Sequence, residues 1–271
     1  MESRIKFIDA LKGFAILLVV MGHTITYMYS QPYEQMLSEY PKVTMFWWKL
    51  IYSFHMPLFM FISGYLFCRE NGYSVQSGLK TLWKRTYTLL LPFISWILIT
   101  RYVFQTPKEL WFLRSLFTFI VIALSWELIR RYIQPKWLSI LSDLLVYAGS
   151  YVALIRIVHL LPMNIQTMLD LRPTMWLFFC FGILFRRYNV QRVLQQKWIF
   201  TLALSSFLIL FYCHFTGLTY LPLQNIWLSL SAVVAVWCLF TSQANGDTKW
   251  GGVSCSYRAI HIRNIYIAQL F

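Results

Sequence analysis

The chain of 271 residues contains few charged residues and little that suggests a soluble domain. Asp, Glu, Lys and Arg make up only 13% of it, whereas 58% of the residues are hydrophobic and 19% are aromatic. A soluble domain of this size could not bury so much apolar side chain. The sequence also has no long linker and no low-complexity stretch. The composition therefore predicts a polytopic membrane protein.

Cysteines are also few, and their spacing argues against a disulfide framework and against a metal site. None of the five belongs to a CxxC pair. The five are Cys68, Cys180, Cys213, Cys238 and Cys255. Four of them lie in or at the ends of apolar runs, where a cysteine ordinarily acts as a small buried hydrophobic side chain. We therefore expect no metal.

Acidic residues are scarce beside basic ones, 10 against 24, and the formal net charge is +14. The basic residues fall between the hydrophobic segments, as membrane orientation requires, so we expect no nucleic-acid partner. One set of alternate connections is the more basic: Arg4, Lys6, Arg69, Lys80, Lys84, Arg85, Arg130, Arg131, Lys136, Arg186, Arg187, Arg192 and Lys197. The other set has only Lys42, Lys49, Arg101, Lys108, Arg156 and Arg172. This asymmetry predicts a cytoplasmic N-terminus.

The apolar segments predict an all-α transmembrane bundle with about eight spans. They lie near Phe7–Tyr29, Trp47–Phe67, Tyr87–Phe104, Trp111–Ile129, Leu138–Val158, Thr174–Phe185, Trp198–Phe215 and Leu223–Thr241. The first is no cleavable signal peptide, because it carries Asp9 and Lys12, is too long and lacks a small-x-small cleavage site. Pro57 and Pro92 fall inside or at the start of runs and predict kinks.

His23 and Lys12 lie on one stripe of the first predicted helix. They are separated by about three turns, or roughly 16 Å along the axis. Asp9 is close enough in sequence to pair with Lys12. Ionisable groups at membrane depth suggest a function, here a neutral imidazole that accepts a proton from a hydroxyl. The alternative is that Lys12 reaches the interface and His23 hydrogen-bonds a neighbouring helix.

The second predicted helix contains the run SFHMPLFMFISGYLF, from Ser53 to Phe67. Its Ser63-Gly64 pair favours close packing of two helix backbones over a role in chemistry. His55 supplies a second imidazole in the outer half of this helix.

Four motifs, one for each of the first four predicted helices, resemble in order those of the acyltransferase 3 family of integral membrane O-acyltransferases. They are Arg4-x4-Asp9-x2-Lys12-Gly13-x-Ala15 with His23, Phe59-x-Phe61-Ile62-Ser63-Gly64-Tyr65, Trp83-Lys84-Arg85 with Leu91-Pro92, and Leu110-Trp111-Phe112-Leu113. The resemblance spans about Arg4 to Leu116. The run FHMPLFMFISGYLF is most similar to the sugar O-acetylase branch (fucose 4-O-acetylase-like).

This resemblance implies a bundle of about ten helices in a bacterial-type plasma (inner) membrane. It implies transfer of an acyl group, usually acetyl, from cytoplasmic acyl-coenzyme A to a hydroxyl of an envelope polysaccharide or lipid-linked sugar. His23 would be the general base and Lys12 its paired cation. The substrate-binding candidates are Arg85 (beside Lys84, for the coenzyme phosphates), Trp111, Arg114 and Ser63. Arg114 would either contact the acceptor or the oxyanion, or merely anchor its helix.

The last residues, 246–271, depart from the family, which should continue with further helices. The tail is basic and broken by glycines. Read one nucleotide later, permitted codons for Tyr257–Leu270 can encode IGRYTLEIYILHNY, which resembles the missing helix. We therefore predict an incomplete membrane domain over 1–245 and an out-of-frame tail over 246–271, in a truncated or frameshifted chain.

Two other interpretations remain open. A polytopic transporter or flippase for an envelope precursor could use the stripe of His23 and Lys12 as a polar path, although no internal repeat typical of transporters is present. The chain could also be an inactive remnant of the acyltransferase, since an unfinished bundle exposes polar faces to lipid.

Overall fold

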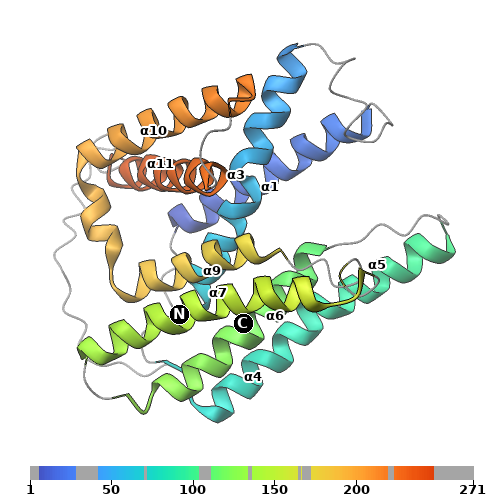
Figure 1. Cartoon of the computed structure of the whole chain (residues 1–271), viewed down its shortest axis with the longest axis vertical. Coiled ribbons are helices and arrows are strands. Elements are labelled where there is room, and N and C mark those ends of the chain that lie inside the picture. Colours follow the sequence, from blue (N-terminus) through green and yellow to red (C-terminus); the bar gives the residue numbers. More distant parts are fainter. Residues whose placement is uncertain are drawn as a thin grey trace. The chain divides into compact units, whose positions relative to one another are not determined.

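In the computed structural model, every regular element of the described residues is a helix. The described residues are 6–28, 42–69, 72–103, 111–133, 136–163, 166, 172–218 and 223–246. The helices are α1 (Lys6–Met28), α3 (Lys42–Phe67), α4 (Val75–Arg85), η1 (Thr86–Leu90), α5 (Leu91–Tyr102), α6 (Trp111–Arg130), α7 (Lys136–Leu160), α9 (Pro173–Arg187), η2 (Val190–Gln195), α10 (Lys197–Thr216) and α11 (Gln224–Gly246) (Figure 1). The predicted all-α fold is confirmed.

Among the described residues, six helices are long and apolar enough to cross a membrane, so the chain is a multi-pass membrane protein. These spans are Phe7–Thr26, Thr44–Phe67, Trp111–Arg130, Trp137–Leu160, Trp198–Thr216 and Gln224–Ser242. The other two predicted segments are also helical over most of their described residues, but their α-helices are shorter: α5 has 12 residues and α9 has 15. Before α5 the helix widens into the π-helical turn η1, where the Leu91 N–H donates to the carbonyl of Thr86. This turn lies just before Pro92, which has no N–H to donate.

The chain separates into two compact units. The first unit comprises Met1–His55 and Val193–Phe271, and the second comprises Met56–Arg192. In the first unit α11 packs against both α10 and α1. The rings of Phe7 and Trp237 meet edge to face at 5.3 Å, and the side chain of Leu11 is fully buried. This packing covers one side of α1 and leaves its other side exposed.

In the second unit the backbones of α3 and α9 cross at two glycines. A Cβ atom on Gly64 would lie 2.8 Å from the carbonyl carbon of Phe179 and closer still to its oxygen. A Cβ atom on Gly182 would lie 2.7 Å from the backbone nitrogen of Tyr65 and closer still to the oxygen of Phe61. Neither position has room for a side chain. The prediction that Gly64 serves close helix packing is therefore confirmed.

Candidate active site

His23 and Lys12 both lie on α1, in the first unit. The Nζ atom of Lys12 is 3.3 Å from Oδ1 of Asp9, and both side chains are about 40% exposed. The predicted pair is therefore present at the start of the helix. His23 is exposed, whereas His55 on α3 is buried with its Nδ1 2.8 Å from the carbonyl oxygen of Ile51. The two imidazoles are close enough for their charges to interact.

A small cluster of polar and aromatic side chains connects α1 to α3 within one turn of His23. Its members are Thr26, Trp48 and Tyr52. The hydroxyl oxygens of Thr26 and Tyr52 are 3.2 Å apart, and the indole N–H of Trp48 donates to the Thr26 hydroxyl at 3.3 Å. The rings of Trp48 and Tyr52 stack at 4.2 Å. Gly22 is buried against this cluster, because a Cβ atom there would lie 3.1 Å from the Tyr52 ring. The cluster therefore sets the orientation of the helix that carries His23.

The remaining predicted residues lie in the second unit, where Trp111 and Arg114 share the first turn of α6. The guanidinium of Arg172 lies 4.0 Å above the Trp111 ring, and that of Arg114 lies 5.6 Å from the centre of the Phe93 ring. The start of α6 thus gathers two cations and two aromatic rings. Such a surface can hold an anionic or planar group.

Arg85 and Ser63 lie apart from that turn of α6 in sequence and in their contacts. Arg85 is half-buried at the end of α4 and exerts its charge on Tyr73. Burial raises the pKa of Tyr73 to about 12, and its hydroxyl donates to the carbonyl of Phe67 at 2.6 Å. Ser63 is half-buried beside Gly64 at the crossing of α3 and α9.

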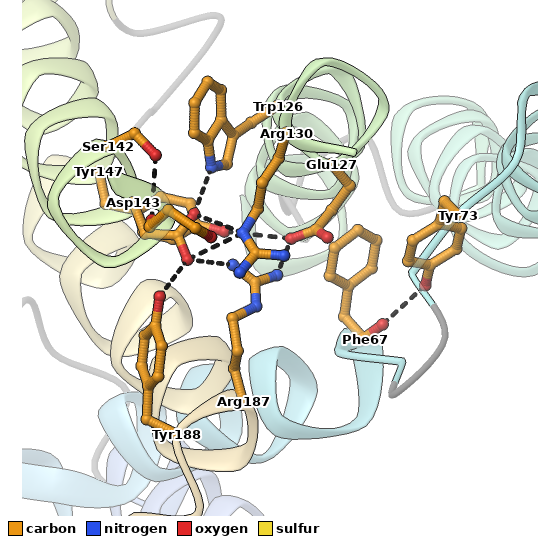
Figure 2. A network of polar contacts seen from close by, with 11 residues as sticks. Phe67, Tyr73, Trp126, Glu127, Arg130, Ser142, Asp143, Tyr147, Arg187 and Tyr188 are labelled. Carbon is orange, nitrogen blue, oxygen red and sulfur yellow. Dashed lines mark hydrogen bonds and ion pairs between the residues drawn. The ribbon is translucent and has the colours of Figure 1, made fainter. Parts of the chain in front are cut away.

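A buried ion network joins α6, α7 and α9 in the second unit (Figure 2). Asp143, on α7, is fully buried and accepts hydrogen bonds from three helix-borne donors: Trp126 Nε1 at 2.8 Å, Arg130 Nε at 2.9 Å and Arg187 at 2.8 Å. The Tyr188 hydroxyl adds a fourth at 2.6 Å. Arg187 also pairs with Glu127, which accepts from the Tyr147 hydroxyl at 3.4 Å.

The network is electrically balanced, because Glu127 and Asp143 face Arg130 and Arg187. Burial and the neighbouring carboxylate of Asp143 raise the pKa of Tyr188 to about 12, so its hydroxyl keeps the proton that it donates. Both carboxylates of the network are already paired with an arginine. This arrangement is therefore better suited to holding three helices together than to binding a ligand.

Comparison with known proteins identifies the family. The acyltransferase domain profile (acyltransferase 3) matches residues 5–257. The chain belongs to this acyltransferase family. It is 29% identical over 214 residues to the nodulation protein NolL of Mesorhizobium japonicum, covering 73% of this chain and 52% of that protein. It is 30% identical over 209 residues to NolL of Sinorhizobium fredii, covering 65% and 47%. The chain thus spans about half the length of these relatives. No solved structure matches it significantly.

Within the described part of this family member, no group of three His, Cys, Asp or Glu side chains could hold a metal ion. Arg4 and Leu110, which carry parts of the predicted motifs, lie outside the described residues, as does 247–271. The out-of-frame tail therefore stays a prediction.

Sequence analysis did not predict two groups of residues in this family member. The cluster of Thr26, Trp48 and Tyr52 involves ordinary aromatic and hydroxyl side chains whose contacts appear only when α1 and α3 pack. Glu127 and Asp143 are easier to recognise in the sequence as members of an ion network, because a carboxylate inside a predicted span needs a partner. Arg130 is close to Glu127 in sequence, but Arg187 is reached only through the fold.

Replacing Arg187 with glutamine is expected to destabilise the second unit by about 3–5 kcal/mol, because two buried carboxylates lose their shared cation. Thermal unfolding of the purified protein in detergent measures this change. Arg131→Gln is the control, since Arg131 is exposed and should shift stability by less than about 1 kcal/mol. Equal unfolding temperatures for both variants would show that the network does not support the fold.

Proposed function

We propose that this protein is a membrane O-acyltransferase that moves an acyl group, most simply acetyl, from acyl-coenzyme A to a sugar hydroxyl. The acceptor is an envelope polysaccharide or its lipid-linked precursor, at the inner membrane of a bacterial cell. The observation that carries the proposal is the family match, joined to an accessible imidazole and a paired cation on one helix.

The chemistry assigned to His23 is general base catalysis. Its neutral imidazole takes the proton of the acceptor hydroxyl while the hydroxyl oxygen attacks the thioester carbonyl carbon. The C–S bond then breaks, the proton passes from the imidazolium to the departing coenzyme thiolate, and an ester is left on the sugar. Base catalysis of this kind contributes about 10²–10⁴-fold to the rate. Exposure of His23 fits this role, because a base must be reachable by the hydroxyl.

The donor is proposed to approach from the cytoplasmic side, where the basic connections predict the start of α1. Lys12 and Arg85 are the cations assigned to its phosphates. The pairing of Lys12 with Asp9 lowers the cost of holding that charge near the membrane and keeps its ammonium in place until an anion arrives. Trp111, Arg114 and Ser63 are assigned to the acyl acceptor or the oxyanion.

The acyl content of the envelope glycan, compared in cells with and without this gene, tests the proposed function. We expect an alkali-labile acyl group that is present only with the gene. An unchanged acyl content together with a fall in exported glycan would instead support a transporter or flippase. No change in either quantity, with the protein present in the membrane, would support the inactive remnant.

A further inference from the structure

Helix α4 has one side that packs in the second unit and one side that does not. It begins with a capping box, in which Ser74 and Ser77 each satisfy the backbone N–H of the other. Gly78 is buried against α6, since a Cβ atom there would lie 3.4 Å from the Leu124 side chain. Figure 1 shows α4 alongside α6 and leading into α5. The side of α4 that carries Gly78 therefore packs against α6.

The outer side of α4 carries an apolar stripe next to a pair of lysines. Val75, Leu79 and Trp83, spaced four residues apart, are 50%, 63% and 65% exposed. Lys80 and Lys84 are also exposed, and each follows a member of the stripe by one residue, so they lie together at its border. One helix face thus combines an exposed indole, aliphatic side chains and two cations.

This stripe continues into the part of the chain predicted to cross the bilayer. The Trp83 ring meets that of Tyr87 edge to face at 4.9 Å, and Tyr87 is itself exposed. Beyond it, exposed apolar side chains follow on α5, among them Leu91, Ile94 and Leu98. A helix face that passes from apolar side chains to Trp, Tyr and Lys matches the passage from acyl chains to headgroups.

We propose that the outer face of α4 lies in the headgroup layer and binds anionic phospholipids through Lys80 and Lys84. Trp83 and Leu79 enter the boundary of the acyl chains, while the two ammonium groups contact headgroup phosphates. Charge complementarity selects the anionic lipid, because the face carries two cations and no carboxylate. Lipid binding by this face depends only on the location of the protein in a membrane, not on the proposed reaction.

This assignment divides the run Trp83-Lys84-Arg85 between two sides of one helix. Trp83 and Lys84 are exposed on the outer face, whereas Arg85 is half-buried on the side near Tyr73. Only Arg85 is therefore kept for the coenzyme, and Lys84 is assigned to lipid.

Amide hydrogen exchange of residues 75–85 tests this proposal in the full-length chain. The protein is reconstituted in vesicles of phosphatidylcholine alone and of phosphatidylcholine with increasing phosphatidylglycerol. We expect phosphatidylglycerol to slow exchange in α4, and high salt to reverse the effect. In Lys80→Gln/Lys84→Gln, each lost lysine should weaken the apparent affinity for the anionic lipid roughly fivefold. The control Arg101→Gln, at the exposed far end of α5, should behave as wild type.

Two results would overturn the proposal. One is equal exchange of α4 in both lipids while α6 exchanges as in the folded protein. The other is that coenzyme A, added to protein in phosphatidylcholine vesicles, slows exchange in α4 of the wild type but not of Lys80→Gln/Lys84→Gln. The two lysines would then bind the acyl donor instead of lipid.

Discussion

Gly182→Ala is expected to abolish the packing of α3 against α9 and with it the folded state of the second unit. The added Cβ would meet backbone atoms of Phe61 and Tyr65, which cannot move aside as a flexible side chain can. Overpacking of side chains typically costs about 1–3 kcal/mol. A clash with backbone on a neighbouring helix should exceed that and reach about 4 kcal/mol or more.

The matched control is Gly149→Ala on α7, where a Cβ atom has nothing within 4 Å. Alanine is the better helix former, so this variant should be neutral or slightly more stable. Unfolding temperature and yield after detergent extraction measure both changes. Equal unfolding temperatures for Gly182→Ala and Gly149→Ala would contradict the close crossing of α3 and α9.

His23→Gln is expected to lower the rate of acyl transfer by about 10²–10⁴-fold while leaving the fold intact. Glutamine can hydrogen-bond much as a neutral imidazole does, but it cannot accept the hydroxyl proton. His23 is exposed on α1, so the substitution removes little packing. Release of the coenzyme thiol, followed with a thiol reagent, reports the rate.

His159→Gln serves as the control, because His159 is an exposed histidine on α7 outside the predicted set of catalytic residues. Its rate should equal that of the wild type. A His23→Gln variant that unfolds at the wild-type temperature and keeps the wild-type rate would remove His23 from the catalytic role.

The helices of this protein could be predicted from sequence because long apolar runs leave the backbone few alternatives in a membrane. The pairing of Lys12 with Asp9 was equally accessible, since one helical turn brings them together. Gly64 was predicted to be a packing residue from its place beside Ser63, and the crossing with α9 confirms it. Each of these features can be recognised from one helix or from residues close together in the sequence.

Features that depend on which helices meet could not be predicted in this way. Gly182 gives no sign in sequence that it opposes Phe61. In the sequence, Arg187 resembles an ordinary basic residue of a predicted cytoplasmic connection, yet its side chain is mostly buried between two carboxylates. The assignment of Lys84 and Arg85 to different sides of α4 likewise required knowing which side of this helix packs against its neighbours. Hydropathy locates the helices, but it does not identify their contacting faces.

Transfer of a labelled acetyl group from acetyl-coenzyme A to envelope glycan, in membranes containing this chain, tests the central claim most directly. The account predicts alkali-labile label on the glycan with the wild type and with His159→Gln, and none above empty membranes with His23→Gln. Label at the empty-membrane level with the folded wild type, or equal label with His23→Gln, would contradict it.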